Sequence, residues 1–294
     1  MTMSQAVSGS TSMRRINPVY VDEAEERRLL SLGGGMIRSE TRAAIRLAGY
    51  VGLTLLLIPV QAVALLLRLP LAERLPRIYH RLCARILGIN VVVRGRRVRE
   101  RPVLFAANHV SYLDITALGA VLPGSFIAKS EVAGWPFFGL LAKLQRTVFV
   151  ARRRSAVSAH SDDISRRLEH GDNLILFPEG TSGDGTRVLP FKSAFFSVAE
   201  RRPGDRPLTV QPVSIAYTRL NGVPLGRGLR PFFAWYGDMA LVPHLFTVAA
   251  LGQLTVVIEF HQPLSLETAG SRKALAAEVQ SRVAEGVARA NAGR

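Results

Sequence analysis

The sequence predicts an α/β fold, with a mixed, largely parallel sheet flanked by helices and an N-terminal hydrophobic segment of membrane-anchoring helices. From position 89 onward, short apolar runs alternate with segments of helical periodicity, a pattern typical of βαβ units. Before that point, the run Leu47–Leu67 reaches the length of roughly 20 apolar residues that a helix needs to cross a bilayer. The long apolar run and the alternating pattern therefore divide the chain into an anchoring region and a folded domain.

Composition divides the chain into three segments. Residues 1–39 are polar or charged and include Gly33–Gly35, so we expect a flexible tail with a short helix at Asp22–Leu30. We expect no secretory signal, because the apolar run begins too late in the chain. Residues 40–88 are expected to hold the membrane-anchoring helices, and residues 89–294 the α/β domain.

The anchoring region is apolar in its first part and amphipathic in its second. Only Pro59 and Gln61 interrupt Leu47–Leu67, whereas Leu71–Leu87 has the periodicity of an amphipathic helix with basic side chains. Arginines flank the apolar run on both sides, namely Arg38, Arg42 and Arg46 before it and Arg68, Arg74, Arg77, Arg81 and Arg85 after it. A single-pass anchor and a helical hairpin embedded in one leaflet both fit this pattern, and a buried helix of a soluble core is the third alternative.

The α/β domain is predicted element by element. Strands are expected at Val91–Arg94, Val103–Ala107, Ser125–Ala128, Thr147–Ala151, Asn173–Phe177, Thr209–Ala216 and Leu254–Phe260. Helices are expected at Leu113–Ala120, Phe137–Leu144, Ser155–Glu169, Ala194–Arg201 and Arg272–Ala290.

Charge and hydrophobicity together restrict the function classes. Lysine and arginine number 38 against 22 acidic residues, so the formal charge is +16, which suits nucleic acid, an anionic membrane or an acidic carrier protein. A hydrophobic content of 48% favours the membrane surface, and an aromatic content of 7% without a recognisable module disfavours nucleic acid. The single cysteine, Cys83, excludes an internal disulfide, and the six histidines show no metal-ligand spacing.

The first candidate site lies where the strand Val103–Ala107 passes into a helix. His109 and Asp114 are five residues apart, and they can meet if His109 lies in the turn and Asp114 in the first helical turn. Asp114 would then hold one ring nitrogen, leaving the other to take a proton from a hydroxyl. The alternative is structural, because Ser111 and Asp114 also have the spacing of a helix capping box.

The second candidate site follows another predicted strand. In Phe177–Ser182, Gly180 allows a tight turn or a close approach to a ligand, and Glu179 places a carboxylate beside it. Ligands of open α/β sheets bind at the carboxyl ends of the strands, where both sites are predicted to lie. Taken alone, this stretch is better explained as an ordinary polar turn, and the basic cluster Arg152–Arg154 is either a solvated helix start or an anion site.

Together these stretches resemble the motifs of the glycerolipid acyltransferase family, typified by lysophosphatidate acyltransferase. The motifs are Asn108-His109-x4-Asp114, Phe149-Val150-Ala151-Arg152, Phe177-Pro178-Glu179-Gly180-Thr181 and the strand around Val210-Gln211-Pro212-Val213. Four motifs in this order are far more specific than any one of them, and the resemblance covers roughly residues 80–265.

The resemblance implies transfer of an acyl group from a thioester of acyl carrier protein or coenzyme A to the hydroxyl of a lysolipid. It implies that His109 is the general base oriented by Asp114, with no cofactor beyond the thioester co-substrate and no metal. Glu179, Gly180, Thr181 and Lys192 would position the acceptor. Backbone amides near the Gly180 turn are candidates for stabilising the negative charge on the thioester oxygen.

Two departures point to a branch of this family. Ser182 stands where phosphate-handling members carry an arginine, and Arg146 stands where the second motif usually opens with glycine. With Trp235–Met239, they resemble the bacterial lyso-ornithine lipid acyltransferases, whose acceptor carries an amine and a carboxylate. Asp184 could face the amine, and the carboxylate could be faced by a basic residue, namely Arg187, Arg152 or Lys192.

Other readings stay open at the level of the sequence. The alternative acceptor is lysophosphatidate, and the more remote alternative is a membrane-surface lipid-binding protein without catalysis. The expected partners are a membrane lipid, an anionic membrane surface and acyl carrier protein, and no nucleic acid. The expected location is the bacterial inner membrane, with the catalytic domain facing the cytoplasm.

Overall fold

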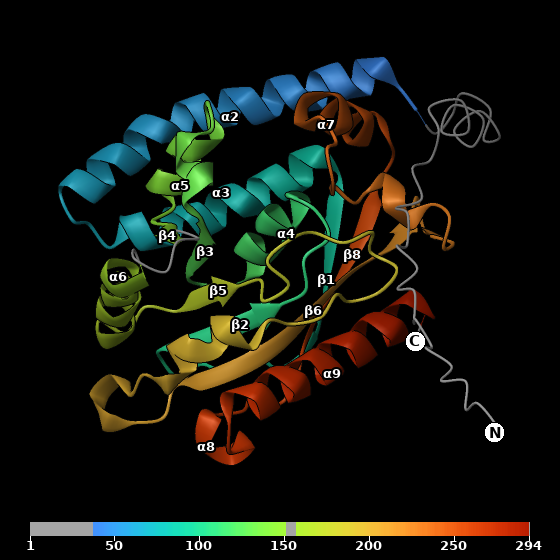
Figure 1. The fold of residues 1–294 in the computed structure, drawn as a ribbon. Helices are drawn as coiled ribbons and strands as arrows, with labels where there is room; N and C mark the ends of the chain where they lie inside the picture. The colour runs from blue at the N-terminus through green and yellow to red at the C-terminus, as the bar shows by residue number, and fades with distance from the viewer. Residues whose placement is uncertain (1–37, 151–156, 294) are drawn as a thin grey trace, which may run out of the picture. The chain divides into compact units, whose positions relative to one another are not determined.

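The computed structural model describes residues 38–150 and 157–293, with side chains from residue 163 onward in the second range (Figure 1). From Arg38 onward the chain forms one compact unit. The predicted short helix at Asp22–Leu30 and most of the predicted tail lie outside the described residues.

One mixed sheet forms the centre of this unit. Its strands are β1 (Ile89–Gly95), β2 (Val103–Ala107), β3 (Ser125–Lys129), β4 (Val148–Val150), β5 (Leu174–Leu176), β6 (Thr209–Leu220), β7 (Val223–Pro224) and β8 (Leu254–Phe260). The order is β1-β8-β6-β2-β5-β3-β4, with β7 paired to β6. Strands β6, β2, β5, β3 and β4 run parallel to one another, and only β8 and β7 pair with β6 in the antiparallel sense.

Helices cover both faces of the sheet. The α-helices are α2 (Glu40–Leu66), α3 (Leu71–Leu87), α4 (Leu113–Val121), α5 (Phe138–Leu144), α6 (Val157–Glu169), α7 (Leu241–Ala250), α8 (Leu266–Ala269) and α9 (Arg272–Asn291). Short 3-10 helices are η1 (Ser130–Gly134), η3 (Ser193–Glu200), η4 (Pro203–Asp205) and η5 (Arg230–Phe232). Helix α9 packs on β6, while α3 and α4 pack together on the opposite side of the sheet (Figure 1).

The most buried strand is β2, at the middle of the sheet. All five of its side chains are fully buried. Leu104 and Ala106 belong to a core cluster that they share with β5, β6 and α9. Because side chains alternate along a strand, Phe105 points to the other face, where it meets Phe260 of β8. A strand buried on both faces fixes its carboxyl end firmly, and the first candidate site begins there.

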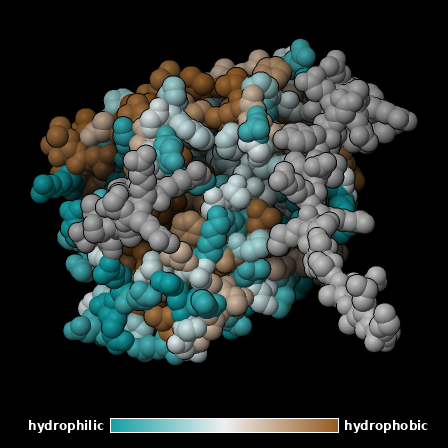
Figure 2. Space-filling model, in the orientation of Figure 1, coloured by the Kyte–Doolittle hydropathy of each residue, from teal (hydrophilic) through white to brown (hydrophobic). Residues whose placement is uncertain are grey.

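Helix α2 lies along the outside of the unit, over α3, α5 and α7 (Figure 1). It is fastened near both ends: Arg46 donates to the carbonyls of Leu251 and Gly252, and Gln61 donates to those of Ala72 and Leu144. Its outward face is apolar, and Figure 2 shows hydrophobic side chains along this edge of the molecule. Exposed apolar side chains of α2 include Ile45, Leu55, Leu56, Val63 and Leu66. By length and composition alone, α2 could cross a membrane.

The structure confirms the predicted fold class and most element positions. The bounds of three elements match the prediction at both ends, namely α3, β2 and β8. A helix is present near the predicted Ala194–Arg201, but it spans Ser193–Glu200 and winds as the tighter 3-10 helix. Helix α7 was not predicted; its apolar sequence, Leu241–Ala250, lacks the polar face that marks a surface helix.

Candidate active site

The two candidate sites meet at one edge of the sheet. Strands β2 and β5 are parallel neighbours, with Ala106 paired to Leu176, so their carboxyl ends lie side by side. The first stretch, Asn108–Tyr112, leaves β2 and enters α4, and the second, Phe177–Thr181, leaves β5. Ligands collect at this edge in open α/β sheets, and the topology therefore brings the two predicted motifs together.

Asn108 fixes the turn that follows β2. Its amide nitrogen donates to the carbonyl of Ile215 at 2.9 Å, and its amide oxygen accepts from the Ile215 N–H at 2.8 Å. The side chain is 2% exposed, so both bonds are protected from water. It thus extends the pairing of β2 with β6 beyond the last backbone pair. These two hydrogen bonds between Asn108 and Ile215 therefore fix the backbone immediately before His109.

His109 and Asp114 form the predicted pair. The His109 Nδ1 atom lies 2.8 Å from Oδ2 of Asp114. Because a carboxylate only accepts hydrogen bonds, Nδ1 carries the proton and Nε2 is left with a free lone pair. The Asp114 side chain is fully buried, whereas that of His109 is 21% exposed and open to a substrate. This is the arrangement of a general base with its orienting acid.

The carboxylate of Asp114 is surrounded by donors. Oδ2 also accepts from the backbone N–H of Val110 at 2.7 Å and of Ser111 at 3.0 Å, and Oδ1 accepts from the hydroxyl of Tyr217. The structural alternative for Asp114 is therefore partly right, since it binds backbone amides before α4. These bonds and the bond to His109 use the same carboxylate, so the turn and the base are ordered together.

Tyr217 is a site residue that the sequence did not reveal. It lies on β6, is 2% exposed and is separated from Asp114 by more than a hundred positions. Burial, the nearby Asp114 charge and the hydrogen bond to that carboxylate raise the pKa of the Tyr217 hydroxyl well above its usual value, so the phenol keeps its proton and donates. We class Tyr217 as a positioning residue, because it acts through Asp114.

An aromatic stack supports the imidazole from one side. The ring of Phe177 lies 4.2 Å from that of His109, centroid to centroid, with 19° between the planes. The ring of Phe126 also stacks on Phe177, with 6.0 Å between the ring centroids. The His109 carbonyl also accepts from the N–H of Gly183 at 2.9 Å. The second motif therefore holds the base of the first in place, a role of Phe177 that the sequence pattern did not indicate.

Glu179 is buried close to the base but lacks the donors that Asp114 has. Its Oε1 accepts one bond of 3.3 Å from the Leu189 N–H, and its Oε2 has no hydrogen-bond partner among the described residues. Burial raises the pKa of Glu179 to about 8, and the Asp114 charge adds to this while backbone hydrogen bonds oppose it. Near neutral pH the side chain is consequently a neutral acid that can donate a hydrogen bond.

The Gly180 turn is tight and is covered by a cation. Its φ of +69° lies in the left-handed region, and a Cβ atom there would lie 3.0 Å from Nζ of Lys192. The structure therefore places the predicted Lys192 directly over the turn. The Gly180 N–H donates to the Phe177 carbonyl at 3.1 Å, so this amide closes the turn and is not free for an oxyanion.

The remaining predicted residues lie around the same loop or outside the described residues. Thr181 and Arg187 are exposed. One oxygen of Asp184 accepts from both the backbone and the hydroxyl of Thr186, which leaves its second oxygen for a ligand. Arg152 falls in the part of the chain that the structure does not describe, so its predicted role stays a prediction.

The segment around Trp235 closes one side of the site. Its N–H donates to the Val110 carbonyl at 2.9 Å, and its carbonyl accepts from the Ser182 hydroxyl. Tyr112, within the first motif, donates to Nδ1 of His244 in α7 at 2.9 Å. Ser182, the residue in place of the expected arginine, thus joins the second motif to the Trp235 segment.

A largely apolar cavity of about 220 Å³ opens between α2, α3, α4 and α5. Tyr112 and Phe126, which border the site, line one part of it. Among its other lining residues are Leu57, Ile58, Trp135, Phe138 and Leu141. Three residues of the stretch Trp135–Leu141 therefore lie on the cavity wall. Among the described residues, no cluster of His, Cys, Asp or Glu could hold a metal ion.

Comparisons with known proteins identify the class to which this fold and site belong. The family model "Acyltransferase" matches residues 90–216. The lyso-ornithine lipid O-acyltransferase of Brucella abortus (strain 2308) is 44% identical over 246 residues, which cover 82% of this chain and 92% of that protein. The chain therefore belongs to the acyltransferase family, as its motifs predicted.

Two further matches define the fold and the alternative acceptor. The 1-acyl-sn-glycerol-3-phosphate acyltransferase of Neisseria gonorrhoeae is 36% identical over 182 residues, covering 61% of this chain and 66% of that protein. The crystal structure of the 1-acyl-sn-glycerophosphate (LPA) acyltransferase PlsC of Thermotoga maritima matches with a TM-score of 0.58 and 23% identity. This match covers 85% of this chain and 96% of that chain, and it confirms the fold.

The pKa of Glu179 predicts a pH dependence of stability. Between its usual value of 4.5 and about 8, the folded state holds a proton that the unfolded state has lost. The free energy of unfolding therefore falls as the pH rises through this window, by up to ~1.4 kcal/mol per pH unit. Urea unfolding in detergent at several pH values should show this slope in the parent and not in Glu179→Gln. Glu285→Gln, at an exposed side chain, should keep the parent slope; equal slopes in all three proteins would contradict the assignment.

Proposed function

We propose that this chain transfers a fatty acyl group from acyl carrier protein or coenzyme A thioester to the hydroxyl of lyso-ornithine lipid, giving ornithine lipid. The observation that carries this proposal is the 2.8 Å contact between His109 Nδ1 and Asp114 Oδ2, beside the apolar cavity. The acceptor is suggested by the relative of Brucella abortus, which is named for that reaction. No cofactor other than the thioester co-substrate is proposed.

The chemistry proceeds in one transfer. Nε2 of His109 removes the proton from the acceptor hydroxyl while the hydroxyl oxygen attacks the carbonyl carbon of the thioester. The C–S bond then breaks, and the imidazolium returns the proton to the leaving thiolate, so the products are an ester and a free thiol. Asp114 stabilises the imidazolium through Nδ1, because the two groups carry opposite charges at that stage. No acyl-enzyme intermediate is needed, so no side chain acts as a nucleophile.

Glu179 and Lys192 are the groups best placed to hold the acceptor. The neutral carboxyl of Glu179 can donate through its unpartnered oxygen, and Lys192 supplies a positive charge over the Gly180 turn. In our proposal Asp184 faces the amine of the ornithine headgroup, while Lys192, Arg187 or Arg152 faces its carboxylate. The short side chain of Ser182 cannot supply the two-pronged phosphate contact that an arginine makes.

The apolar cavity is proposed to hold the acyl chain of one substrate. Its walls include side chains of α2, α3, α4 and α5, and Tyr112 and Phe126 line it beside the site, so a chain could lie in it while its carbonyl reaches His109. Burial of each methylene group contributes roughly 0.8 kcal/mol to binding. A chain site joined to a general base distinguishes this reading from a lipid carrier, which has no use for the base.

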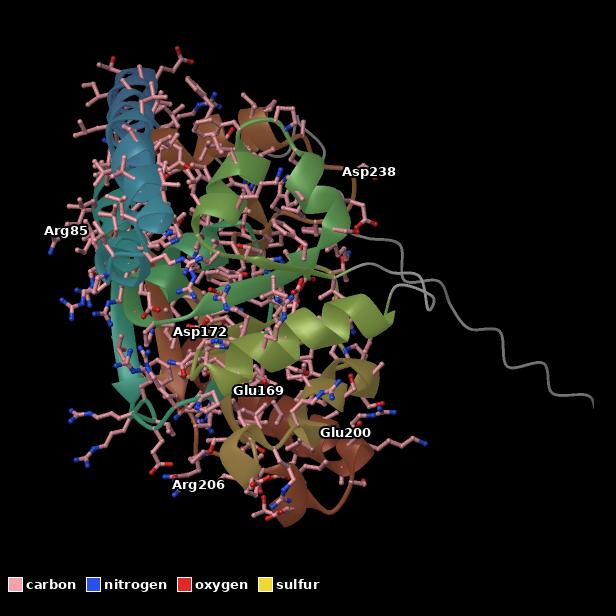
Figure 3. The ribbon with its side chains drawn as sticks, turned by 90° about the vertical axis from the view of Figure 1, so that its left-hand side faces the viewer. Arg85, Glu169, Asp172, Glu200, Arg206 and Asp238 are labelled. Atoms are coloured by element: carbon pink, nitrogen blue, oxygen red, sulfur yellow. The ribbon has the colours of Figure 1, made fainter. Side chains whose placement is uncertain are left out.

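Membrane binding is proposed to be in-plane, on one leaflet. Helix α2 is fastened to α3, α5 and α7 along its length while its other face exposes apolar side chains, as a helix lying in the interface does. Arginines of α3 border this helix; Arg85, for example, points away from the body of the protein (Figure 3). We place the protein on the cytoplasmic face of the bacterial inner membrane, whose anionic lipids attract such basic groups.

Lysophosphatidate is the alternative acceptor, favoured by the Neisseria gonorrhoeae relative. Purified protein should acylate lyso-ornithine lipid faster than lysophosphatidate when each is offered with the same acyl carrier protein thioester, as shown by mass spectrometry of the products. Ser182→Arg should move the ratio of the two kcat/KM values toward lysophosphatidate by about tenfold, because an arginine can bind the phosphate through two hydrogen bonds.

The control for this experiment adds the same charge elsewhere. Ser281 is exposed on α9, and its hydroxyl donates to Glu285 of the same helix at 3.2 Å, so Ser281→Arg should leave the ratio unchanged. A parent enzyme that acylates lysophosphatidate alone would overturn the proposed acceptor. An unchanged ratio in Ser182→Arg would remove Ser182 from the explanation of specificity.

Docking of acyl carrier protein is proposed to depend on the basic surface of the chain. The net charge of +16 should attract this acidic partner, and salt screens such attraction. Raising ionic strength from ~0.05 to ~0.5 M should therefore lower kcat/KM for the carrier-bound acyl group by about tenfold or more. The same change should barely affect a short, uncharged acyl thioester; equal sensitivity of the two donors would contradict electrostatic docking.

A further inference from the structure

The connection from β3 to α5 exposes large apolar side chains beside the cavity. Trp135 is 39% exposed, Phe137 is 37% exposed and Leu140 is 47% exposed. We call this stretch, Trp135–Leu140, the aromatic corner. Clustered apolar groups of this size on a surface mark a contact with a protein, a ligand or a membrane. The corner also lies on the cavity wall, because Trp135 and Phe138 both line it.

The backbone holds the corner in a conformation that costs free energy. Phe137 has a φ of 62° and a ψ of −55°, a region that residues with a side chain seldom adopt. The Gly139 N–H donates to the Trp135 carbonyl at 2.9 Å, and the Leu141 N–H to the Phe137 carbonyl at 3.2 Å, which maintain this shape. Strain of this kind persists where the surrounding structure imposes it, and it is commonest at functional sites.

The corner leads into α5, which contacts the apolar helix α2. Helix α5, which starts at Phe138, packs against α2, and Gln61 of α2 donates to the Leu144 carbonyl at the end of α5 (Figure 1). On α2, Leu56 is 67% exposed and Val63 is 52% exposed. Exposed apolar side chains on two elements that contact each other suit a single extended partner. A bilayer is such a partner, and tryptophan prefers its interface with water.

We propose that the aromatic corner is a second membrane-contacting element, which inserts at the boundary between headgroups and acyl chains and forms the entrance of a lipid chain into the cavity. Trp135 contributes to both functions, because it is exposed on one side and lines the cavity on the other. It also makes an edge-to-face contact with Trp235, at 6.1 Å, and thereby reaches the segment that closes the active site. This inference rests on the proposed membrane-bound function.

The two tryptophans of the chain permit a direct test. Trp235→Phe leaves Trp135 as the only fluorescent tryptophan, and Trp135→Phe leaves Trp235. Each variant is mixed with vesicles of phosphatidylcholine and phosphatidylglycerol whose acyl chains are brominated near the headgroup. We expect Trp135 fluorescence to fall several-fold, because bromine quenches only on contact, and Trp235 fluorescence to change little. Unquenched Trp135 in protein that sediments with the vesicles would overturn the inference while leaving in-plane binding through α2 intact.

A second pair of variants tests the entrance. Phe137→Ser combined with Leu140→Ser changes two exposed side chains, and Val223→Ser is the control at an exposed position on β7. The double variant should lose about tenfold in kcat/KM for lysolipid in vesicles, since it removes two apolar side chains from the interface. With a short-chain lysolipid and a short thioester in solution, the double variant should keep the parent rate. The control Val223→Ser should keep the parent rate in both the vesicle assay and the soluble assay.

Other outcomes assign the corner differently. An equal loss of activity with the soluble substrates would show that the corner only shapes the cavity, and would contradict the proposal. A change of Trp135 fluorescence on adding acyl carrier protein without vesicles would assign the corner to protein docking and overturn it. A parent protein that transfers no acyl group to any lysolipid would refute the proposed function. The quenching experiment does not require activity, so it tests the membrane contact of the corner separately.

Discussion

The buried carboxylate of Asp114 is the group on which the rest of the site depends. A charge that is fully buried must be surrounded by hydrogen-bond donors, and here they come from the turn after β2, from Tyr217 on β6 and from the imidazole of His109. The hydrogen bonds to the Asp114 carboxylate therefore fix the path of the turn, the start of α4 and the orientation of the His109 imidazole. Glu179 shows the contrasting case, because the same kind of side chain, buried with one oxygen unpartnered among the described residues, has its pKa raised to about 8. Two neighbouring carboxyl groups thus differ in their hydrogen-bond partners and in their proposed uses.

The sheet explains why the chemistry occurs where it does, and the helices explain why it occurs on lipid. Parallel pairing of β2 with β5 and β6 brings His109, Phe177 and Tyr217 to one edge, from three distant parts of the sequence. Helices α2, α3, α4 and α5 then enclose an apolar cavity against this edge. Tyr112 and Phe126, which border the site, lie on the cavity wall, and α2 on the outside of the cavity exposes apolar side chains.

Local signals were sufficient for much of this architecture, and long-range contacts account for the rest. The pair His109 and Asp114 could be predicted because both residues lie within one turn, and the strands β2 and β8 because they are continuous apolar runs. Tyr217 could not, since no local pattern on β6 indicates which of its side chains reaches a turn a hundred residues away. Stacking of Phe177 on His109 likewise depends on how β5 pairs with β2. The 3-10 form of Ser193–Glu200 arises in a short apolar segment, where propensity is a weak guide and packing decides.

The central claim is that His109 and Asp114 act as one unit, and a double-mutant cycle tests it most directly. The rate of ester formation is measured for His109→Ala, for Asp114→Asn and for the double variant, with tritiated acyl thioester and saturating lysolipid. Groups that act as a unit lose their effect together, so the double variant should be no slower than His109→Ala. Full activity in His109→Ala, or losses that multiply in the double variant, would contradict the account.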